Sequence, residues 1–418
     1  MADTSTQVSK GIYYITNVDT SAIRGKGTSL LGRNWFNALE ISLTGIHHIQ
    51  EKQEIREAVF AEGLGSYTGA PINIEINSDV KPIFLKSRAV PYAREKVDEE
   101  LRRLETAGVL EAVQHSEWAT PIVLVLKKDG HVRLCGDYRA TVNKAIKTDT
   151  YPLPTVTELL AQLAGGKRFT KLDLSEAYLQ LPVDEATSRI LTINTTRGLF
   201  RVKRLPYGIS SAPSVFQRVM DTVLAGLTGV GANLDDLLIA GESKEQLTDR
   251  ENKAFERIFN TGLRLKKSKC ILNTDAVEYL GYRVDAEGVH PVAEKVEAIH
   301  KAPAPKNKEE LQAFLGLLNF YSCFLPHKAT VLEPLHRLLD NKTKWIWTAM
   351  HDKEFRSAKK MVIASTVLTH YDPEKPLMLA CDASPYGLGA VLSHVNSDGL
   401  ERPIAFASFF FYEGGGNV

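Results

Sequence analysis

The chain of 418 residues is 44% hydrophobic and 24% charged, which is typical of globular protein and long enough for about three compact units. Its net charge of +1 does not by itself point to a nucleic-acid partner. Its four cysteines form no Cys-x-x-Cys pair, which argues against a zinc module and a disulfide framework. Residues 1–10 are polar and the apolar runs are short, which argues against a secretory leader and a membrane span. We therefore expect an intracellular chain, in the cytoplasm or the nucleus.

The first part of the chain shows short, weakly patterned elements. Ile12 to Ile15 predicts a strand, and Glu51 to Phe60 predicts a short charged helix followed by Gly- and Pro-containing loops. Asp19-Thr20-Ser21 lacks the glycine of an aspartic-protease motif, so it predicts no protease nucleophile. Residues 49–89 are expected to form a linker.

A predicted hairpin carries the first candidate binding residues. Residues 95–110 predict an amphipathic helix, and residues 118–126 predict a strand that returns after a tight turn. Lys127, Lys128 and Arg133 lie on this hairpin, where fixed cations can offset the charge of a triphosphate. A solvated basic hairpin fits the same pattern.

The next segment places an acid at the end of a strand. Residues 152–163 predict a helix that starts after Pro152-Leu153-Pro154, and the strand that follows it ends at Asp173. Tyr178 comes five positions later and fits either of two roles, under the sugar of a bound nucleotide or in a helix core. Ser214 is the expected cap of a helix that runs to Leu227.

Residues 231–241 contain the strongest chemical pattern of the chain. Asp235 and Asp236 separate two short apolar runs bounded by glycine, which predicts two strands joined by a tight turn with both acids at its tip. Neighbouring like charges resist joint ionisation, and with Asp173 they make three carboxylates that could hold two divalent ions. A merely solvated turn is the alternative.

The remaining elements follow in order. Arg264, Lys266, Lys267 and Lys269 form a basic cluster that fits either a phosphate backbone or a solvated face. The pattern predicts a helix at residues 244–261, which Gly262 ends, and a strand at residues 277–284. It then predicts a helix at residues 307–326, capped by Asn307, and a three-stranded meander at residues 377–407.

These residues closely resemble the pol polyprotein of Gypsy-class LTR retrotransposons. The resemblance extends from about Ile72 to Ser408 and rests on nine motifs in the family's order. They are Trp118 to Ile122, Lys127 to Gly130, Cys135 to Arg139, Lys171 to Gln180, Leu205 to Pro213, Leu234 to Leu238, Tyr279 to Tyr282, Phe314 to Leu317 and Cys381 to Ser384.

The resemblance implies an α+β fold, in which a right-hand polymerase with fingers, palm and thumb precedes an incomplete ribonuclease H-like α/β domain. The implied parts are a C-terminal remnant of a retropepsin (residues 1–48), a linker (49–89), the fingers and palm of a reverse transcriptase (90–284), its thumb (285–347) and a truncated ribonuclease H-like domain (353–418). The remnant is recognised by Leu30 to Trp35 and lacks a catalytic Asp-Thr-Gly, so we expect no protease activity from it.

The resemblance also implies the roles of single residues. Asp173, Asp235 and Asp236 match the catalytic carboxylates that bind two Mg²⁺ ions, for which Mn²⁺ can substitute. The nucleotide-binding residues implied are Lys127, Lys128, Arg133, Tyr178 as the residue that excludes a 2′-hydroxyl, and Tyr207 beside the nucleotide. The implied partners are an RNA or DNA template with its primer, and dNTPs.

Two departures from the family bear on activity. Asn233 stands where the family usually has a tyrosine next to the primer end, so it offers no aromatic face there. Asp382 matches one ribonuclease H metal ligand, but further acids of that family do not follow, so we expect no hydrolysis of RNA.

The function expected is therefore an RNA-directed DNA polymerase of an LTR retrotransposon. A catalytically impaired relic of such an element, acting as a nucleic-acid-binding or interaction protein, is the alternative.

Overall fold

The structure is a computed structural model and divides the chain into two compact units, Met1–Glu51 and Lys52–Val418. It describes residues 6–9, 12–15, 52–89, 94–126, 130, 132–147, 151–363, 367–384, 387–396 and 399–410. Within these residues, every helix is too short or too polar to cross a lipid bilayer.

The first unit is described only in its hairpin. β1 (Thr6–Ser9) pairs antiparallel with β2 (Ile12–Ile15), as the apolar run at Ile12 predicts. Leu30 to Trp35 lies outside the described residues. The retropepsin remnant therefore stays a prediction.

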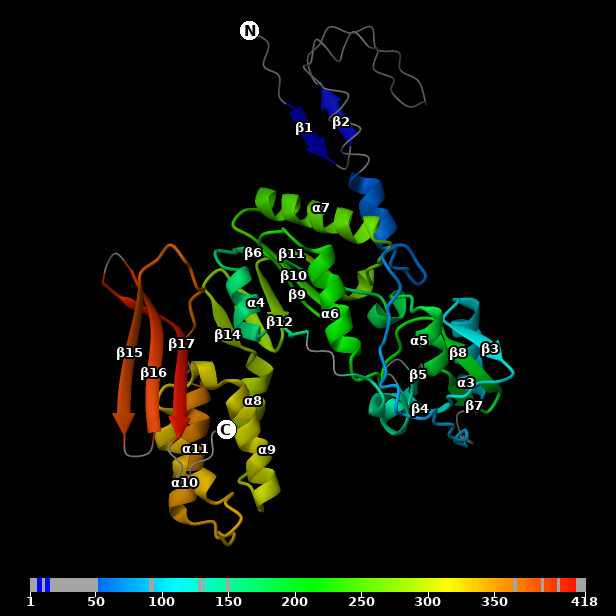
Figure 1. Ribbon diagram of the computed structural model, residues 1–418. Helices are drawn as coiled ribbons and strands as arrows, with labels where there is room; N and C mark the ends of the chain where they lie inside the picture. The colour runs from blue at the N-terminus through cyan, green and yellow to red at the C-terminus, as the bar shows by residue number, and fades with distance from the viewer. Residues whose placement is uncertain are drawn as a thin grey trace. The chain divides into compact units, whose positions relative to one another are not determined.

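In the larger unit, a five-stranded sheet holds the predicted basic hairpin (Figure 1). β4 and β5 form that hairpin, β4 pairs parallel with β7, and the other pairings are antiparallel. Helix α3 (Arg94–Thr106) buries Val97, Leu101 and Leu104 and contacts β3 and β5. The strand order is β3 (Leu110–Val113), β8 (Gly198–Val202), β7 (Ile193–Thr195), β4 (Thr120–Leu126) and β5 (Val132–Gly136).

Residues 52–89, expected to form a linker, pack onto this unit. A helix spans residues 52–59, and Val59 and Ile74 are buried in the core shared with both sheets. Isolated bridges join Ile72 to Val183 and Phe84 to Ala119.

A four-stranded antiparallel sheet carries the three aspartates (Figure 1). Leu237 and Ile239 of its strand β10 face one core, whereas Leu238 and Ala240 face another, because successive strand residues point to opposite faces. Burial on both faces explains the unbroken apolar run that follows Asp236. The strand order is β11 (Ile271–Thr274), β6 (Arg168–Asp173), β10 (Asp236–Gly241) and β9 (Val230–Asn233).

Three helices cover the two faces of this sheet. Leu159 of α4 (Val156–Gln162) belongs to one core, and Phe216 of α6 (Ala212–Val223) and Phe255 of α7 (Lys244–Asn260) belong to the other. Helix α4 therefore covers one face of the sheet, and helices α6 and α7 cover the other face.

Two predicted helices have other boundaries in the structure. α3 ends at Thr106 rather than residue 110, because Gly108 adopts a φ of 67° and the chain turns into β3. α4 starts after Thr155, which forms a capping box with Glu158, as expected for a helix that follows Pro154. α6 starts after Ser211 and ends at Val223, so Ser214 lies inside the helix rather than at its cap.

The single strand predicted at residues 277–284 is two strands. β12 (Ala276–Tyr279) and β13 (Tyr282–Asp285) form a hairpin around Leu280 and Gly281, with φ of 49° and 81°. Positive φ at both central residues is the pattern of a type I′ turn, whose twist suits a two-residue hairpin. β14 (Val289–Pro291) completes a three-stranded sheet.

The last part of the chain contains four helices and the predicted meander (Figure 1). Leu311, Leu318, Leu335 and Phe355 are buried in their common core. Helix α9 starts after Asn307 as predicted, but it ends at Phe320 rather than at Pro326. The elements are α8 (Ala293–Lys301), α9 (Lys308–Phe320), α10 (Lys328–Arg337), α11 (Ala349–Ile363), β15 (Leu377–Ser384), β16 (Gly387–Val395) and β17 (Glu401–Phe410).

Candidate active site

The three predicted carboxylates meet at one end of the four-stranded sheet. Asp173 is the last residue of β6 and pairs in register with Asp236, the first residue of β10. Residues directly opposite each other in an antiparallel pair project their side chains from the same face of the sheet, about 5 Å apart at Cβ. Asp235 precedes β10 in the turn, and its carbonyl oxygen accepts from the Leu174 amide at 3.3 Å.

The turn that presents the acids has an unusual backbone. Asn233 of β9 pairs with Asp236, which leaves Leu234 and Asp235 as a two-residue loop. Leu234 has a φ of 55°, a left-handed conformation that is costly for a residue with a branched side chain. The predicted hairpin with acids at its tip is therefore present, with local backbone strain at the tip.

The site carries an excess of negative charge. Loss of hydration within the turn raises the pKa of Asp235, and the nearby charges of Asp236 and Asp173 raise it further. Its own backbone N–H and the Lys269 ammonium oppose this rise. The carboxylate still lies at the exposed tip of the turn, open to a cation from solvent.

Two lysines neutralise the other two carboxylates. Nζ of Lys269 lies 3.0 and 2.9 Å from the two carboxylate oxygens of Asp173, a side chain that is only 11% exposed. Nζ of Lys171 lies 3.2 Å from Oδ1 of Asp236. These two ammonium groups therefore reduce the repulsion between the Asp173 and Asp236 carboxylates.

Neither Lys171 nor Lys269 was predicted from the sequence to be part of the site. Lys171 lies two residues before Asp173 on β6, so strand alternation puts both side chains on one face. This spacing could have identified it. Lys269 belongs to the basic cluster, but nothing local connects that cluster with Asp173, which lies far upstream in the sequence.

The candidate nucleotide-binding residues are only partly described. The Tyr178 ring packs edge-on against Tyr207, with centroids 5.3 Å apart, and against Phe216 at 5.1 Å. The Arg133 guanidinium lies over the Tyr207 ring, 4.5 Å from its centroid. Lys127 and Lys128 lie outside the described residues.

The charge of Asp235 contributes to the pKa values of both Tyr178 and Tyr207. Burial raises the pKa of Tyr178, and the charge of Asp235 adds to this rise. Burial likewise raises the pKa of Tyr207 to about 12, although the Arg133 charge opposes it. Both phenols are therefore neutral at physiological pH.

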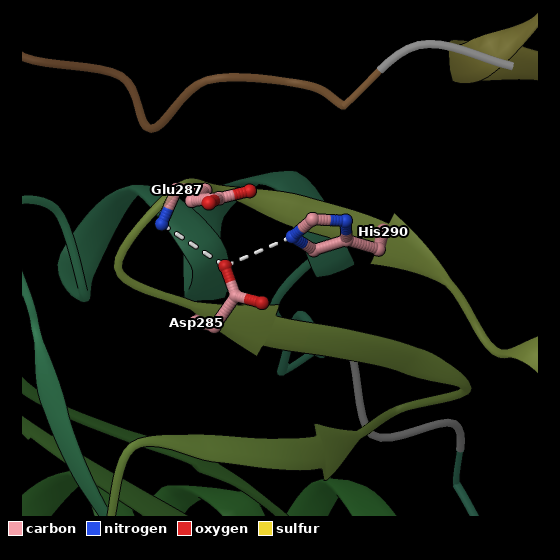
Figure 2. A group of neighbouring side chains, drawn as sticks. All are labelled: Asp285, Glu287 and His290. Carbon is pink, nitrogen blue, oxygen red and sulfur yellow. Dashed lines mark hydrogen bonds and ion pairs between the residues drawn. The ribbon is translucent and has the colours of Figure 1, made fainter.

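A different set of side chains brings possible metal-ligand atoms closer together than the three aspartates do (Figure 2). Among the described residues, Asp285, Glu287 and His290 bring one ligand atom each within 4.8 Å of one another, whereas the three aspartates do not form such a group. Oδ1 of Asp285 already accepts from the Glu287 amide at 3.0 Å, the Gly288 amide at 3.3 Å and His290 Nε2 at 2.9 Å. This carboxylate therefore closes the turn between β13 and β14.

Asp382 belongs to a different sheet from Asp173 and Asp236. It sits on β15 opposite Gly389 of β16, with an exposed side chain. It belongs to no group of three close metal-ligand side chains within the described ranges. Its role as a ribonuclease H ligand, and the expected lack of RNA hydrolysis, stay predictions.

Two family models match the chain at these elements. Residues 125–284 match the reverse transcriptase (RNA-dependent DNA polymerase) family, and residues 347–413 match the RNase H-like domain found in reverse transcriptase. The chain therefore belongs to the reverse transcriptases. More particularly, it belongs with the pol polyproteins of Gypsy-class LTR retrotransposons, as its motifs indicated.

The relatives support this placement. The chain is 34% identical over 331 residues to the uncharacterized protein K02A2.6 of Caenorhabditis elegans, over 75% of this chain. It is 30% identical over 343 residues to the transposon Tf2-3 polyprotein of Schizosaccharomyces pombe, over 81% of this chain. The chain spans 26% of the length of each of these relatives.

Solved structures confirm the predicted polymerase fold. The foamy viral protease-reverse transcriptase in complex with dsDNA aligns with a TM-score of 0.78 at 23% identity, covering 92% of this chain and 82% of that one. A structure of the same viral enzyme in complex with RNA/DNA hybrid aligns with a TM-score of 0.74 at 24% identity, covering 89% of this chain and 51% of that one. The predicted α+β class is thus confirmed, whereas the predicted domain boundaries stay predictions.

Proposed function

We propose that the chain is an RNA-directed DNA polymerase that adds deoxynucleotides to the 3′-hydroxyl of a primer on an RNA or DNA template. The observation that carries this proposal is the convergence of Asp173, Asp235 and Asp236 at one sheet end, with a surplus of negative charge. A structural role alone would not favour three acids there, because like charges directly opposite each other destabilise a sheet. The reverse transcriptase family match supports the same activity.

The donor set fits divalent metal ions. Carboxylate oxygens are the ligands that Mg²⁺ prefers. Loss of hydration raises the pKa of Asp235, and the charges of Asp236 and Asp173 add to this rise, which a bound cation would offset. We assign Asp173, Asp235 and Asp236 as ligands of two Mg²⁺ ions, for which Mn²⁺ can substitute. When bound, such ions activate a primer hydroxyl and stabilise the charge of a leaving pyrophosphate.

The chain's own residues would hold the nucleotide. Arg133, whose guanidinium lies over the Tyr207 ring, would offer its charge to the triphosphate, and we assign Tyr178 to the position beside the sugar. Lys127 and Lys128, which directly follow β4 in the sequence, would add two more positive charges. Discrimination against a 2′-hydroxyl would then follow from the fixed Tyr178 ring.

The proposed polymer substrate is a primer paired with its template. Complexes of the similar viral enzyme with dsDNA and with RNA/DNA hybrid support this choice for the present fold. No partner of the chain is needed to explain the arrangement of the carboxylates.

Primer extension tests the proposal. The purified chain with Mg²⁺, dNTPs and an RNA template annealed to a DNA primer is expected to extend the primer. Asp235→Asn removes a ligand charge without changing volume, so we expect extension to fall by at least a hundredfold. Asp79→Asn on the exposed surface is the matched control and should extend normally. Equal extension by Asp235→Asn and the parent would refute the metal-ligand assignment.

Asn233 favours a second candidate function, that of a nucleic-acid-binding relic with impaired catalysis. Asn233 lies half-buried at the end of β9, paired with Asp236, where it offers no aromatic ring to a primer end. Asn233→Tyr should then raise the extension rate while primer–template affinity stays constant. A parent chain that binds primer–template but extends it only after this substitution would support the relic function.

A further inference from the structure

Gln217 of helix α6 makes three hydrogen bonds around the catalytic turn although it carries no charge. Its side chain is fully buried, with 0% exposure. Oε1 accepts from the Leu234 amide at 2.8 Å, and Nε2 donates to the Ala232 carbonyl at 2.9 Å. Nε2 also donates to Oδ1 of Asp221 at 2.9 Å, one helical turn further along α6.

These partners permit one orientation of the Gln217 amide. Both atoms that face Nε2, the Ala232 carbonyl and the Asp221 carboxylate, can only accept hydrogen bonds. A flipped amide would place its oxygen against both acceptors and its NH₂ group against the Leu234 N–H. Asp221 is itself held by the Tyr151 hydroxyl, which donates to its Oδ2 at 2.5 Å. The network therefore points Oε1 at Leu234.

The hydrogen bond to Leu234 acts at the strained point of the turn. Leu234 has a positive φ and Asp235 does not, which is the pattern of a type II′ hairpin turn, where glycine is usual at the first central position. A leucine there persists only where surrounding contacts hold the backbone. Gln217 bonds to the residues on both sides of Asn233, directly before the two catalytic acids.

We infer that Gln217 is a positioning residue for the nucleotidyl transfer, because its amide fixes the Leu234–Asp235 turn and thereby the direction of Asp235 and Asp236. Asp221 contributes by fixing the orientation of the Gln217 amide. This inference rests on the proposed function, since the two acids are assigned there as metal ligands. It adds a neutral, buried residue of helix α6 to the three acids, which β6, β10 and the turn before β10 carry.

Two substitutions and a matched control test the inference. Gln217→Met keeps the length of the side chain and removes all three hydrogen bonds. Asp221→Ala changes an exposed residue and removes the group that orients the amide, together with the acceptor of the Tyr151 hydroxyl. Gln246→Met is the control, because Gln246 on α7 also accepts from a backbone amide, that of Glu242 at 2.8 Å, away from the turn.

The first readout is hydrogen exchange of the Leu234 amide, measured by NMR without substrate. We expect exchange at least tenfold faster in Gln217→Met, about threefold faster in Asp221→Ala and unchanged in Gln246→Met. Unchanged exchange at Leu234 in both test variants would overturn the hydrogen-bonding role of Gln217. This readout is independent of polymerase activity.

The second readout separates chemistry from binding. We expect kcat of Gln217→Met to fall at least tenfold while KM for dNTP and the Kd for primer–template change less than twofold. Faster Leu234 exchange with unchanged kcat would overturn the positioning role. A parent chain that extends no primer would instead refute the proposed function, and the exchange data would still decide whether Gln217 holds the turn.

Discussion

Asp236 lies directly opposite Asp173 in the antiparallel pairing of β10 with β6. Such a pair of like charges destabilises a sheet, and here each acid has a separate lysine within ion-pair distance, Lys171 for Asp236 and Lys269 for Asp173. Asp235 has no such lysine within ion-pair distance among the described residues. The sheet end is therefore arranged for charge that the protein alone neutralises only in part.

Asp235→Asn is expected to raise the thermal stability of the metal-free chain. The folded-state pKa of Asp235 is raised, so its ionised form is less favourable in the folded than in the unfolded chain, and stability is lost as pH rises above the unfolded pKa. Because the carboxylate is solvent-exposed, we expect a small gain at pH 7, of about 1 °C in Tm.

Calorimetry at pH 7 with EDTA measures this effect, and Asp79→Asn serves as the control. The gain should shrink as pH falls, because the raised pKa protonates the parent carboxylate in the folded chain before the unfolded one. A fall in Tm at pH 7 would contradict the charge excess assigned to the turn.

Lys269→Gln is expected to tighten binding of a divalent ion. The Lys269 ammonium contacts both oxygens of Asp173, so an ion that uses this carboxylate must displace it. An ion pair with a half-exposed lysine contributes about 0.2–1 kcal/mol, which corresponds to a roughly one- to fivefold gain in affinity. Mn²⁺ binding followed by electron paramagnetic resonance measures it without any reaction.

Lys267→Gln is the matched control, because Lys267 lies on the same short 3₁₀ helix and is exposed. It should change Mn²⁺ affinity less than Lys269→Gln does. Weaker Mn²⁺ binding by Lys269→Gln would show that the lysine supports the bound ion instead of competing with it.

Tyr178→Ala is expected to admit ribonucleotides. The ring of Tyr178 is fixed by edge-on contacts with Tyr207 and Phe216, so it cannot move aside for a 2′-hydroxyl. Removal of the ring should lower discrimination between dNTP and rNTP by roughly tenfold to a hundredfold. Single-nucleotide incorporation with matched dNTP and rNTP measures the ratio of kcat/KM.

Tyr178→Phe retains the ring and should retain the discrimination. If Tyr178→Ala and the parent discriminate equally, Tyr178 is an aromatic of the core and not a sugar contact.

Local patterns were enough to predict the carboxylates and the strands that carry them. The apolar runs around Asp173, Asp235 and Asp236 match strands β6, β9 and β10, because burial on both faces leaves a clear hydrophobic run. The Leu280–Gly281 turn was missed because it interrupts one such run without polar residues.

The contacts that Lys269 and Gln217 make at the site could not be predicted in the same way. The contact between Lys269 and Asp173 joins residues far apart in sequence, and the contact between Gln217 and Leu234 depends on how α6 packs against β9. Such contacts follow from tertiary packing, and no spacing rule within one segment encodes them.

Asp137 is expected to stabilise the folded chain less in acid than at neutral pH. Its buried carboxylate accepts from Nε of Arg139 at 2.8 Å and from the Arg88 guanidinium at 2.7 Å. These bonds lower the pKa of Asp137 to about 2, with Arg139 making the larger contribution and burial opposing it. A lowered folded-state pKa means stability that is present above the unfolded pKa of about 4 and lost as pH falls toward 2. Both arginines are largely exposed, so solvent screening limits the contribution to about 1 kcal/mol.

Asp137→Asn should therefore destabilise the chain by about 1 kcal/mol at pH 7, and the difference from the parent should narrow steadily between pH 4 and pH 3. Urea unfolding at several pH values, followed by circular dichroism, measures this difference. Asp79→Asn is again the control and should track the parent throughout. A gap between Asp137→Asn and the parent that stays constant down to pH 3 would mean that the carboxylate contributes through packing and neutral hydrogen bonds rather than through its charge.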